Sequence, residues 1–192
     1  MLASSLVLIL AAFAPSGEAA LTVKGRSNGA LFSGNGSKEL PPFRVRTRST
    51  LRWTNTGRIF QTFSKGLAGG NVNSTARTGA TFLEPGSYRL SVNAIGSWVI
   101  RIVAGVERPA RLGGGRMGFK GNGGRELPPF TTRRGGQMSW TNSGSIFQIF
   151  NQTLSGGGDV NSQAHRGTTY LDAGQHKLVI NAIGNWIVSW KP

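Results

Sequence analysis

Polar and apolar residues alternate in short stretches along this chain, and glycine, proline, asparagine or aspartate interrupts the alternation about every ten residues. Such alternation places every second side chain on the same face, which is typical of half-buried β-strands. In the first half of the chain the predicted strands are 43–47, 51–55, 59–63, 81–83, 88–93 and 98–103. No stretch indicates a helix, so the sequence predicts an all-β fold.

The strand pattern occurs twice because the sequence contains an internal repeat. Phe32–Phe43 returns as Phe119–Phe130 with an offset of 87, and after an extra glycine in Gly156–Gly158 the offset becomes 88. Such a repeat indicates a duplication. We therefore expect two tandem small antiparallel β-sandwich domains of jelly-roll-like topology, residues 21–104 and 105–192. The glycines Gly113–Gly115 are predicted to form a hinge between them.

The last predicted strand of each repeat carries the strongest core signal. Trp98, Ile100 and Ile102 occupy alternate positions, so they share one face, and Trp186 lies at the position that matches Trp98. Both tryptophans are therefore predicted to be buried. The turn at residues 95–97 contains glycine, which predicts a hairpin between the strands on either side.

The first twenty residues are typical of a signal peptide. Leu6–Ala14 is an apolar run followed by small residues, and it is too short to span a bilayer. We expect residues 1–20 to be removed and the mature protein to be secreted, on the cell surface or periplasmic, with no membrane span. Met1–Ser5 lacks the usual Lys or Arg, so an uncleaved anchor and a misplaced start codon both stay open.

The order of motifs in both repeats resembles known domains. Gly-x-Gly, Pro-Phe, Trp, Gly-x-x-Phe, Pro-Gly-x-Tyr-x-Leu-x-Val and Gly-x-Trp-x-Ile follow one another through the first repeat. This order resembles the small secreted β-domains of bacterial cell-envelope proteins and is similar in rhythm to pre-peptidase C-terminal domains. The resemblance implies a binding or secretion role, not catalysis. The acidic residues with which some of those relatives bind calcium have no counterpart here.

Catalytic residues do not recur in the two repeats. The chain has no cysteine, which excludes disulfides, thiolate metal sites and thiol nucleophiles. Its two histidines, His165 and His176, align with Arg77 and Tyr88 of the first repeat. We therefore expect no enzyme activity, no cofactor and no metal site. A tertiary contact between carboxylates such as those of Glu39 and Glu84 stays open.

The net charge of +15 is the remaining guide to function. Residues 21–104 hold 12 basic and 2 acidic residues, and residues 105–192 hold 10 and 4. Charge of this size favours binding to a polyanionic surface polymer or polysaccharide. Nucleic acid is expected to bind only non-specifically, because the aromatic residues alternate into the core and leave no stacking platform. A solvated basic surface without a particular partner is the alternative.

Strand parity suggests where an anion would bind. A three-residue loop at 48–50 would set Arg46 opposite Arg52 and Arg44 beside Thr54, all facing away from the core. Like charges opposite each other across two strands are mildly destabilising, and a bound anion would relieve them.

The second repeat keeps only part of this pattern. Arg133 matches Arg46, whereas Ser139 replaces Arg52. The candidate anion-binding residues are Arg44, Arg46, Arg52 and Arg133.

Three functions are consistent with these observations. The favoured one is a secreted, non-catalytic binding or adhesive module of the cell surface, for polyanionic polymer or carbohydrate. The carbohydrate version requires an exposed Trp53 or Trp140. The alternatives are a structural or assembly protein of an extracellular complex, whose edge strands pair with other subunits, and an enzyme whose site is assembled only by the fold. The ligand and the oligomeric state stay open.

Overall fold

The computed structural model describes residues 24–26, 29–65, 69–153 and 156–192. Within them the chain forms 22 β-strands and one short 3-10 turn, η1 (Gly113–Gly115), which confirms the all-β prediction. No helix in this part of the chain is long and apolar enough to cross a membrane. The predicted signal peptide, residues 1–20, lies outside the described residues.

The first repeat forms two facing sheets and a small third one. Its strands are β1 (Lys24–Arg26), β2 (Gly29–Asn35), β3 (Lys38–Glu39), β4 (Phe43–Val45), β5 (Ser49–Asn55), β6 (Phe60–Ser64), β7 (Val72–Ser74), β8 (Thr78–Leu83), β9 (Gly86–Tyr88), β10 (Leu90–Ala94) and β11 (Ser97–Ala104). One sheet has the order β1-β2-β11-β5-β8 and the other contains β7-β6-β10-β3, while β4 pairs with β9 alone.

The second repeat has the same arrangement. Its strands are β12 (Ala110–Leu112), β13 (Arg116–Asn122), β14 (Gly124–Glu126), β15 (Phe130–Thr132), β16 (Gly136–Asn142), β17 (Phe147–Asn151), β18 (Val160–Ser162), β19 (Arg166–Leu171), β20 (Gly174–His176), β21 (Leu178–Ala182) and β22 (Asn185–Trp190). The order β12-β13-β22-β16-β19 faces β18-β17-β21-β14, and β15 pairs with β20.

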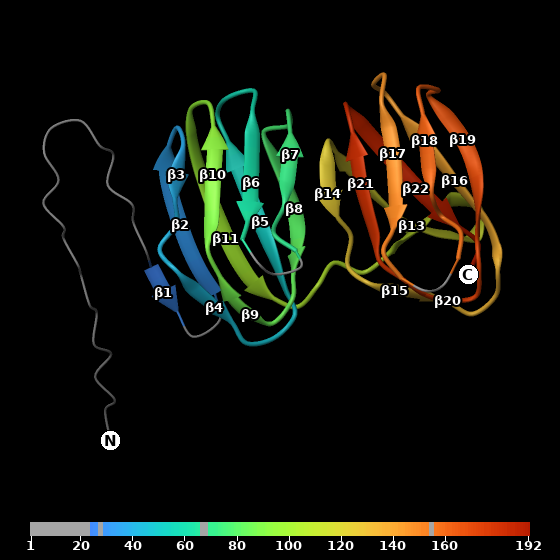
Figure 1. Ribbon diagram of the computed structural model, residues 1–192, viewed down its shortest axis with the longest axis horizontal. Helices are drawn as coiled ribbons and strands as arrows, with labels where there is room; N and C mark the ends of the chain where they lie inside the picture. Colours follow the sequence, from blue (N-terminus) through green and yellow to red (C-terminus); the bar gives the residue numbers. More distant parts are fainter. Residues whose placement is uncertain (1–23, 27–28, 66–68, 154–155) are drawn as a thin grey trace, which may run out of the picture.

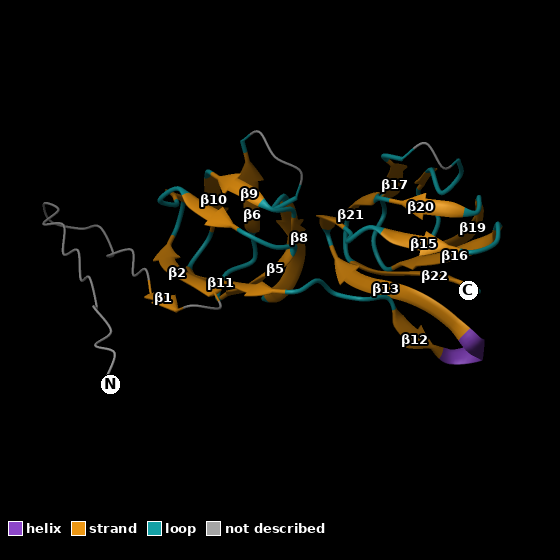
Figure 2. Ribbon diagram, turned by 90° about the horizontal axis from the view of Figure 1, so that it is seen from below, coloured by secondary structure: helices purple, strands orange, loops and turns teal. Residues whose placement is uncertain are grey.

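Each repeat encloses a hydrophobic cluster of its own between its two layers. Figure 2 shows the two layers edge-on. Trp53 of β5 stacks on Phe60 of β6 at 4.4 Å between ring centroids, which joins the layers. Trp98 and Trp186 are both 1% exposed, so the prediction that they are buried is confirmed. The alternation along β11 explains this: Trp98, Ile100 and Ile102 face the core, while Val99 and Arg101 face solvent.

The two repeats are joined edge to edge. Strand β7 of the first repeat pairs antiparallel with β14 of the second, with Asn73 opposite Gly124 and Val72 opposite Arg125. We call the sheets β7-β6-β10-β3 and β18-β17-β21-β14 the inner sheets of the two repeats. The pairing joins them into one eight-stranded sheet, ordered β18-β17-β21-β14-β7-β6-β10-β3 (Figure 1).

Two predicted connections are wrong. Strands β10 and β11, on either side of the turn at 95–97, do not pair: β10 pairs with β3 and β6, and β11 pairs with β2 and β5. The turn therefore crosses between layers instead of closing a hairpin. The glycines Gly113–Gly115 are not a hinge between the repeats, because they turn the β12–β13 hairpin within the second repeat (Figure 2).

The buried Trp98 ring should contribute strongly to the stability of the first repeat. Its Nε1 donates a hydrogen bond to the Gly36 carbonyl at 2.8 Å, and the rest of the ring lies in the core. Trp98→Ala should lower the free energy of unfolding by about 3–5 kcal/mol, measured by denaturant titration. Val99→Ala on the same strand is the control, since Val99 is exposed, and should cost less than about 1 kcal/mol. An unchanged denaturation midpoint for Trp98→Ala would contradict this packing.

Candidate anion-binding site

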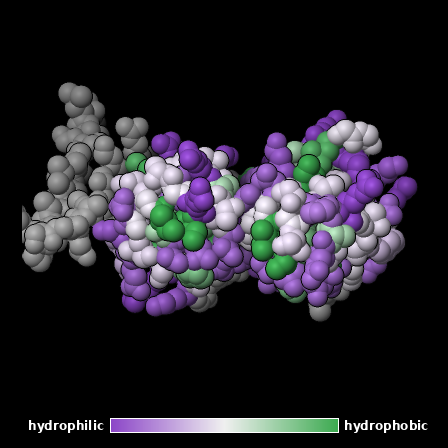
Figure 3. Space-filling model, turned by 90° about the horizontal axis from the view of Figure 1, so that it is seen from above, coloured by the Kyte–Doolittle hydropathy of each residue, from purple (hydrophilic) through white to green (hydrophobic). Residues whose placement is uncertain are grey.

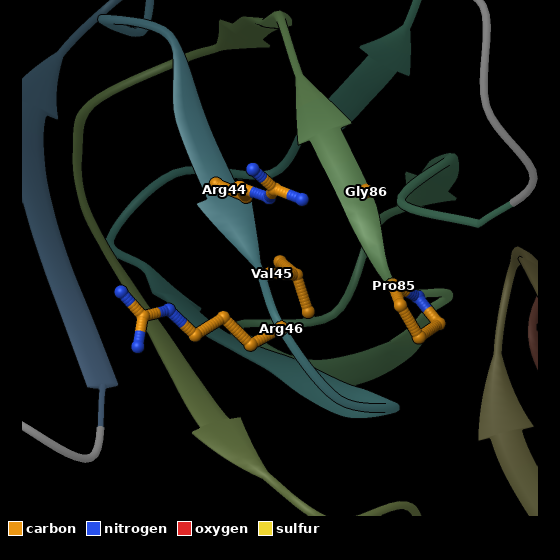
Figure 4. Close-up of a pocket in the computed structure, with 5 residues that line it drawn as sticks. All are labelled: Arg44, Val45, Arg46, Pro85 and Gly86. Atoms are coloured by element: carbon orange, nitrogen blue, oxygen red, sulfur yellow. The ribbon is translucent and has the colours of Figure 1, made fainter.

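Two of the four candidate arginines lie at the short strand β4: Arg44 is within the strand and Arg46 follows its last residue. Arg44 and Arg46 are exposed on either side of the buried Val45, and together with Pro85 and Gly86 they line a shallow hollow of about 430 Å³. The pairing of β4 with β9 forms this hollow, because it sets Val45 opposite Gly86. In Figure 4 the side chain of Arg44 extends toward β9, whereas that of Arg46 extends away from it.

No described residue neutralises the charge of these two arginines. No hydrogen bond or ion pair of either guanidinium occurs within the described residues, and no carboxylate lines the hollow. The carboxylate of Glu84, next to Pro85, is 3.1 Å from Arg48 Nε and forms an ion pair there. Because the two free guanidinium groups diverge, they suit two successive charges of an extended anion better than one small ion.

Arg52 does not join them, and the predicted register is wrong. Strand β4 ends at Val45 and pairs with β9, so Arg46 is not opposite Arg52. Arg52 lies on β5 of the five-stranded sheet, where Arg101 of β11 is directly opposite it. The parity argument assumed that neighbouring strands form a hairpin. In this fold the chain instead changes sheets between β4 and β5.

The exposed pair Arg52 and Arg101 is a basic feature that sequence reasoning missed. The equivalent residues of the second repeat are Ser139 and Ser189, which are also opposite each other. There, one guanidinium serves both serines: Arg116 Nη2 donates to Ser139 Oγ at 2.9 Å, and its Nε donates to Ser189 Oγ at 2.9 Å. An alignment of the two repeats could have indicated this pair: Arg52 and Arg101 both become serine in the second repeat, and Arg116 replaces Gly29 there.

Arg133, the fourth candidate, lies just beyond β15 in the second repeat and is exposed. Its neighbour Thr131 stands where the first repeat has Arg44. The structure therefore brings Arg44 and Arg46 together and leaves Arg52 and Arg133 elsewhere.

A second hollow, of about 490 Å³, lies where the repeats meet. Its most buried charge is Arg125, which is 8% exposed. Arg125 Nη1 donates to the Ala80 carbonyl at 2.8 Å, and Nη2 donates to Glu107 Oε2 at 2.9 Å. Burial lowers the pKa of Arg125, and the Glu107 carboxylate opposes that shift. The bond to Ala80 connects the two repeats. Because the Glu107 carboxylate already pairs with this guanidinium, less of its charge is left for a ligand.

Exposed tryptophans are absent from the candidate positions. Trp53 is 3% exposed and Trp140 is 4% exposed, so the carbohydrate version, which required one of these rings at the surface, is wrong. The face shown in Figure 3 is largely polar, with small separate apolar areas on both repeats. Exposed isoleucines adjoin at equivalent turns, Ile59 with Ile95 and Ile146 with Ile183.

The histidines and carboxylates of the described residues do not gather into a metal-binding cluster. His176 is fully buried: its Nε2 lies 2.9 Å from the Asp172 carbonyl, and its Nδ1 lies 3.1 Å from Asn151 Nδ2. An amide N–H at Nδ1 and a carbonyl at Nε2 fit the tautomer with hydrogen on Nε2. The part of the chain that is described contains no group of three or more His, Cys, Asp or Glu residues that could hold a metal ion.

The two acids that could have met in the first repeat remain apart in their interactions. Glu84 pairs with Arg48, and Glu39 Oε1 is 3.8 Å from Lys65 Nζ at the surface. Neither carboxylate has the other as a partner, so they do not form the acid and base pair that general acid–base catalysis requires.

Comparisons with known proteins give distant similarities. No family model matches the chain, and no curated protein matches it. Among solved structures it is similar to a cupin 2 conserved barrel domain protein from Leptotrichia buccalis, with TM-score 0.31, 13% identity, and 93% of this chain and 92% of that chain covered. It is also similar to a salicylate 1,2-dioxygenase from Pseudaminobacter salicylatoxidans, with TM-score 0.30, 9% identity, and coverage of 91% and 77%. A third is protein Ylba from E. coli, with TM-score 0.26, 12% identity, and coverage of 88% and 81%.

These neighbours correct the resemblance drawn from the motifs. They are cupin-type barrel proteins and not secreted cell-envelope β-domains or pre-peptidase C-terminal domains. That resemblance is therefore wrong, and so is the function inferred with it, a secreted binding or adhesive module of the cell surface. With TM-scores of 0.31 or less, the similarities do not place the chain among the cupins and bring no activity to it.

Tyr88, the residue of the first repeat that aligns with His176, should make the stability of the protein depend on pH. Tyr88 is fully buried, with its hydroxyl donating to the Glu84 carbonyl at 2.7 Å. Burial raises the pKa of Tyr88 to about 12 from its ordinary value of 10.0. The unfolded chain therefore loses this proton first, so stability is complete below pH 10 and falls as pH rises toward 12, by about 1.4 kcal/mol per pH unit.

Tyr88→Phe isolates this effect from the titration of lysines. The variant should be less stable at pH 8, by about 1 kcal/mol, because the Glu84 carbonyl loses its donor. Its stability should nevertheless decline less steeply than that of the parent between pH 10 and 12, measured by urea unfolding at each pH. Parallel declines for the two proteins would show that Tyr88 does not titrate differently on folding.

Proposed function

We propose that this protein binds anionic polymers non-covalently, such as an acidic polysaccharide, with Arg44 and Arg46 as its principal contacts. The observation that supports the proposal most is the hollow beside β4, where two exposed guanidinium groups have no carboxylate partner among the described residues. A net charge of +15 adds a long-range attraction for any polyanion. Nucleic acid would bind through its phosphates alone and without sequence preference.

The other exposed arginines act as secondary contacts in this proposal. Arg52 and Arg101 repel each other across adjacent strands, and an anion bound between them would remove that repulsion. Arg133 offers one charge where the first repeat has two, because Thr131 replaces Arg44. The first repeat should therefore be the stronger binder.

The proposal includes no catalysis and no cofactor, which accords with the separate engagement of Glu39, Glu84 and His176 described above. It also treats the repeats, 21–104 and 105–192, as two tandem β-sandwich domains. Their separate hydrophobic clusters support this division. Export through residues 1–20 stays a prediction, which N-terminal sequencing of the mature protein would test.

Binding of fluorescent polyuronate, followed by anisotropy at several salt concentrations, tests the site. The variant Arg44→Ser/Arg46→Ser should weaken binding at least tenfold at low salt. It should also reduce the slope of log affinity against log salt by about 2, since two ion contacts are lost. Double-stranded DNA as a second probe should show the same change in slope.

The matched control is Arg58→Ser/Arg77→Ser, which removes the same charge from two exposed arginines at the Asn55 end of β5. Its affinity should change less than about threefold, by the loss of long-range attraction only. If both double variants lose the same affinity, total charge and not the β4 hollow determines binding, and the proposed site is wrong.

A further inference from the structure

The joint between the repeats, which is the pairing of β7 with β14, uses only one edge of each inner sheet. Strand β14 occupies the position in the second repeat that β3 occupies in the first, and β18 corresponds to β7. Because β7 pairs with β14, their counterparts β18 and β3 remain at the two ends of the eight-stranded sheet (Figure 1). Each molecule therefore carries a second, unused copy of both halves of its own joint.

We propose that β18 of one molecule pairs with β3 of another in the register of β7 and β14, so that copies of this chain associate head to tail. Asn161 would then face Ser37, and Val160 would face Lys38, as Asn73 faces Gly124 and Val72 faces Arg125. A head-to-tail contact of this kind is not closed by its own symmetry, so the sheet can extend from copy to copy.

The backbone at the free edge has the shape that the joint needs. Gly123, which precedes β14, has φ +67°, and its counterpart Gly36 has φ +65°. A Cβ at Gly123 would overlap the Asn73 carbonyl oxygen, whereas the space around Gly36 is empty. The two strands approach closely only because glycine stands there, and the unused edge keeps that glycine.

Asn122 and Ser74, which hydrogen-bond across the joint, have identical counterparts at the two outer edges, whereas the counterpart of Arg125 is Lys38. Asn122 Oδ1 accepts hydrogen bonds from Ser74 Oγ at 2.9 Å and from Ala76 N at 3.2 Å. Its counterpart is Asn35, whose Nδ2 donates to Ser97 at 3.0 Å, as that of Asn122 does to Asn185 at 2.9 Å.

On the opposite edge, Ser162 Oγ accepts a hydrogen bond from Ala164 N at 3.0 Å, as Ser74 Oγ does from Ala76 N at 3.1 Å. Gly124 is replaced by Ser37 at the free edge. A Cβ at Gly124 would lie 3.6 Å from Asn73 Cβ, an ordinary contact, so this difference is compatible with pairing.

One substitution opposes the association. In the joint, Asn71 Nδ2 donates to Glu126 Oε1 at 2.8 Å. At the outer edges the counterparts are Asp159 and Glu39, two carboxylates that would repel each other. Asp159 is held as Asn71 is, since its Oδ1 accepts from the backbone N–H of Asn151 at 2.9 Å. Asp159 thus keeps contact between copies weak, whereas the joint within one chain also gains from its covalent tether.

Sedimentation velocity of the full chain and of Asp159→Asn tests the proposal, without any anionic ligand, between about 10 μM and 1 mM protein. Asp159→Asn restores an amide donor opposite a carboxylate, so it should lower the concentration for half-association about tenfold or more relative to the parent. The average mass should continue to grow beyond the dimer with concentration. A variant that stays folded but monomeric, or that stops at a dimer, would overturn the proposal.

Two further variants in the Asp159→Asn background locate the contact. Gly36→Asn places a side chain where the partner strand must approach, and asparagine tolerates the positive φ at this position, so the variant should fold and remain monomeric. Gly114→Asn is the matched control, since Gly114 has φ +70° and open space but lies in the β12–β13 turn. It should associate like its parent. Association that persists in Gly36→Asn would exclude β3 as the contact.

Discussion

The antiparallel pairing of β7 with β14 is the contact on which the arrangement of the two repeats depends. Edge strands carry unpaired N–H and C=O groups, and the fold satisfies one such edge of each repeat with the other. The side chains around the pairing then acquire partners from the other repeat. Glu126 is 7% exposed and accepts from Asn71, whereas the side chain of the equivalent Glu39 is 79% exposed. Two nearly identical segments thus differ in burial because only one lies in the joint.

The same contact explains the position of Arg125. Its guanidinium donates to the Ala80 carbonyl of the first repeat and to Glu107 in the connecting segment, and it lies 5.3 Å from the centroid of the Trp186 ring. Burying a charge is costly unless hydrogen bonds and an opposite charge compensate it, and both are present here. Arg44 and Arg46 lie away from the joint and have no such partners in the part of the chain that the structure describes, and both are exposed.

The sequence predicts much of the fold because a two-residue period is a local property. The all-β class and the buried rings of Trp98 and Trp186 follow from alternation within one strand, and the repeat follows from identities between the two halves of the sequence. Strands β1, β2, β3 and β7 lie outside every predicted range and were missed, and the predicted strand 88–93 is divided between β9 and β10. Gly34 of β2 lies against the Trp98 ring, where a Cβ would come within 2.5 Å of it, so glycine there serves close packing inside a strand.

Pairing between strands depends on the path of the chain, which alternation does not encode. The predicted contact of Arg46 with Arg52 failed because the chain leaves one sheet after Val45 and enters another at Ser49. Arg101, the residue that does face Arg52, lies far along the sequence and became visible only with the register of β5 and β11. The exposure of the candidate arginines was predictable; their grouping was not.

Nuclear Overhauser contacts across the joint test the central claim, that the repeats share one continuous sheet. Protons of Val72 and Asn73 should show cross-strand contacts with Gly124 and Arg125, because these residues are paired in the register of β7 and β14. Relaxation measurements on the same sample should give one rotational correlation time for both repeats. Missing cross-strand contacts, together with faster and separate tumbling of residues 29–104 and 105–192, would contradict the account.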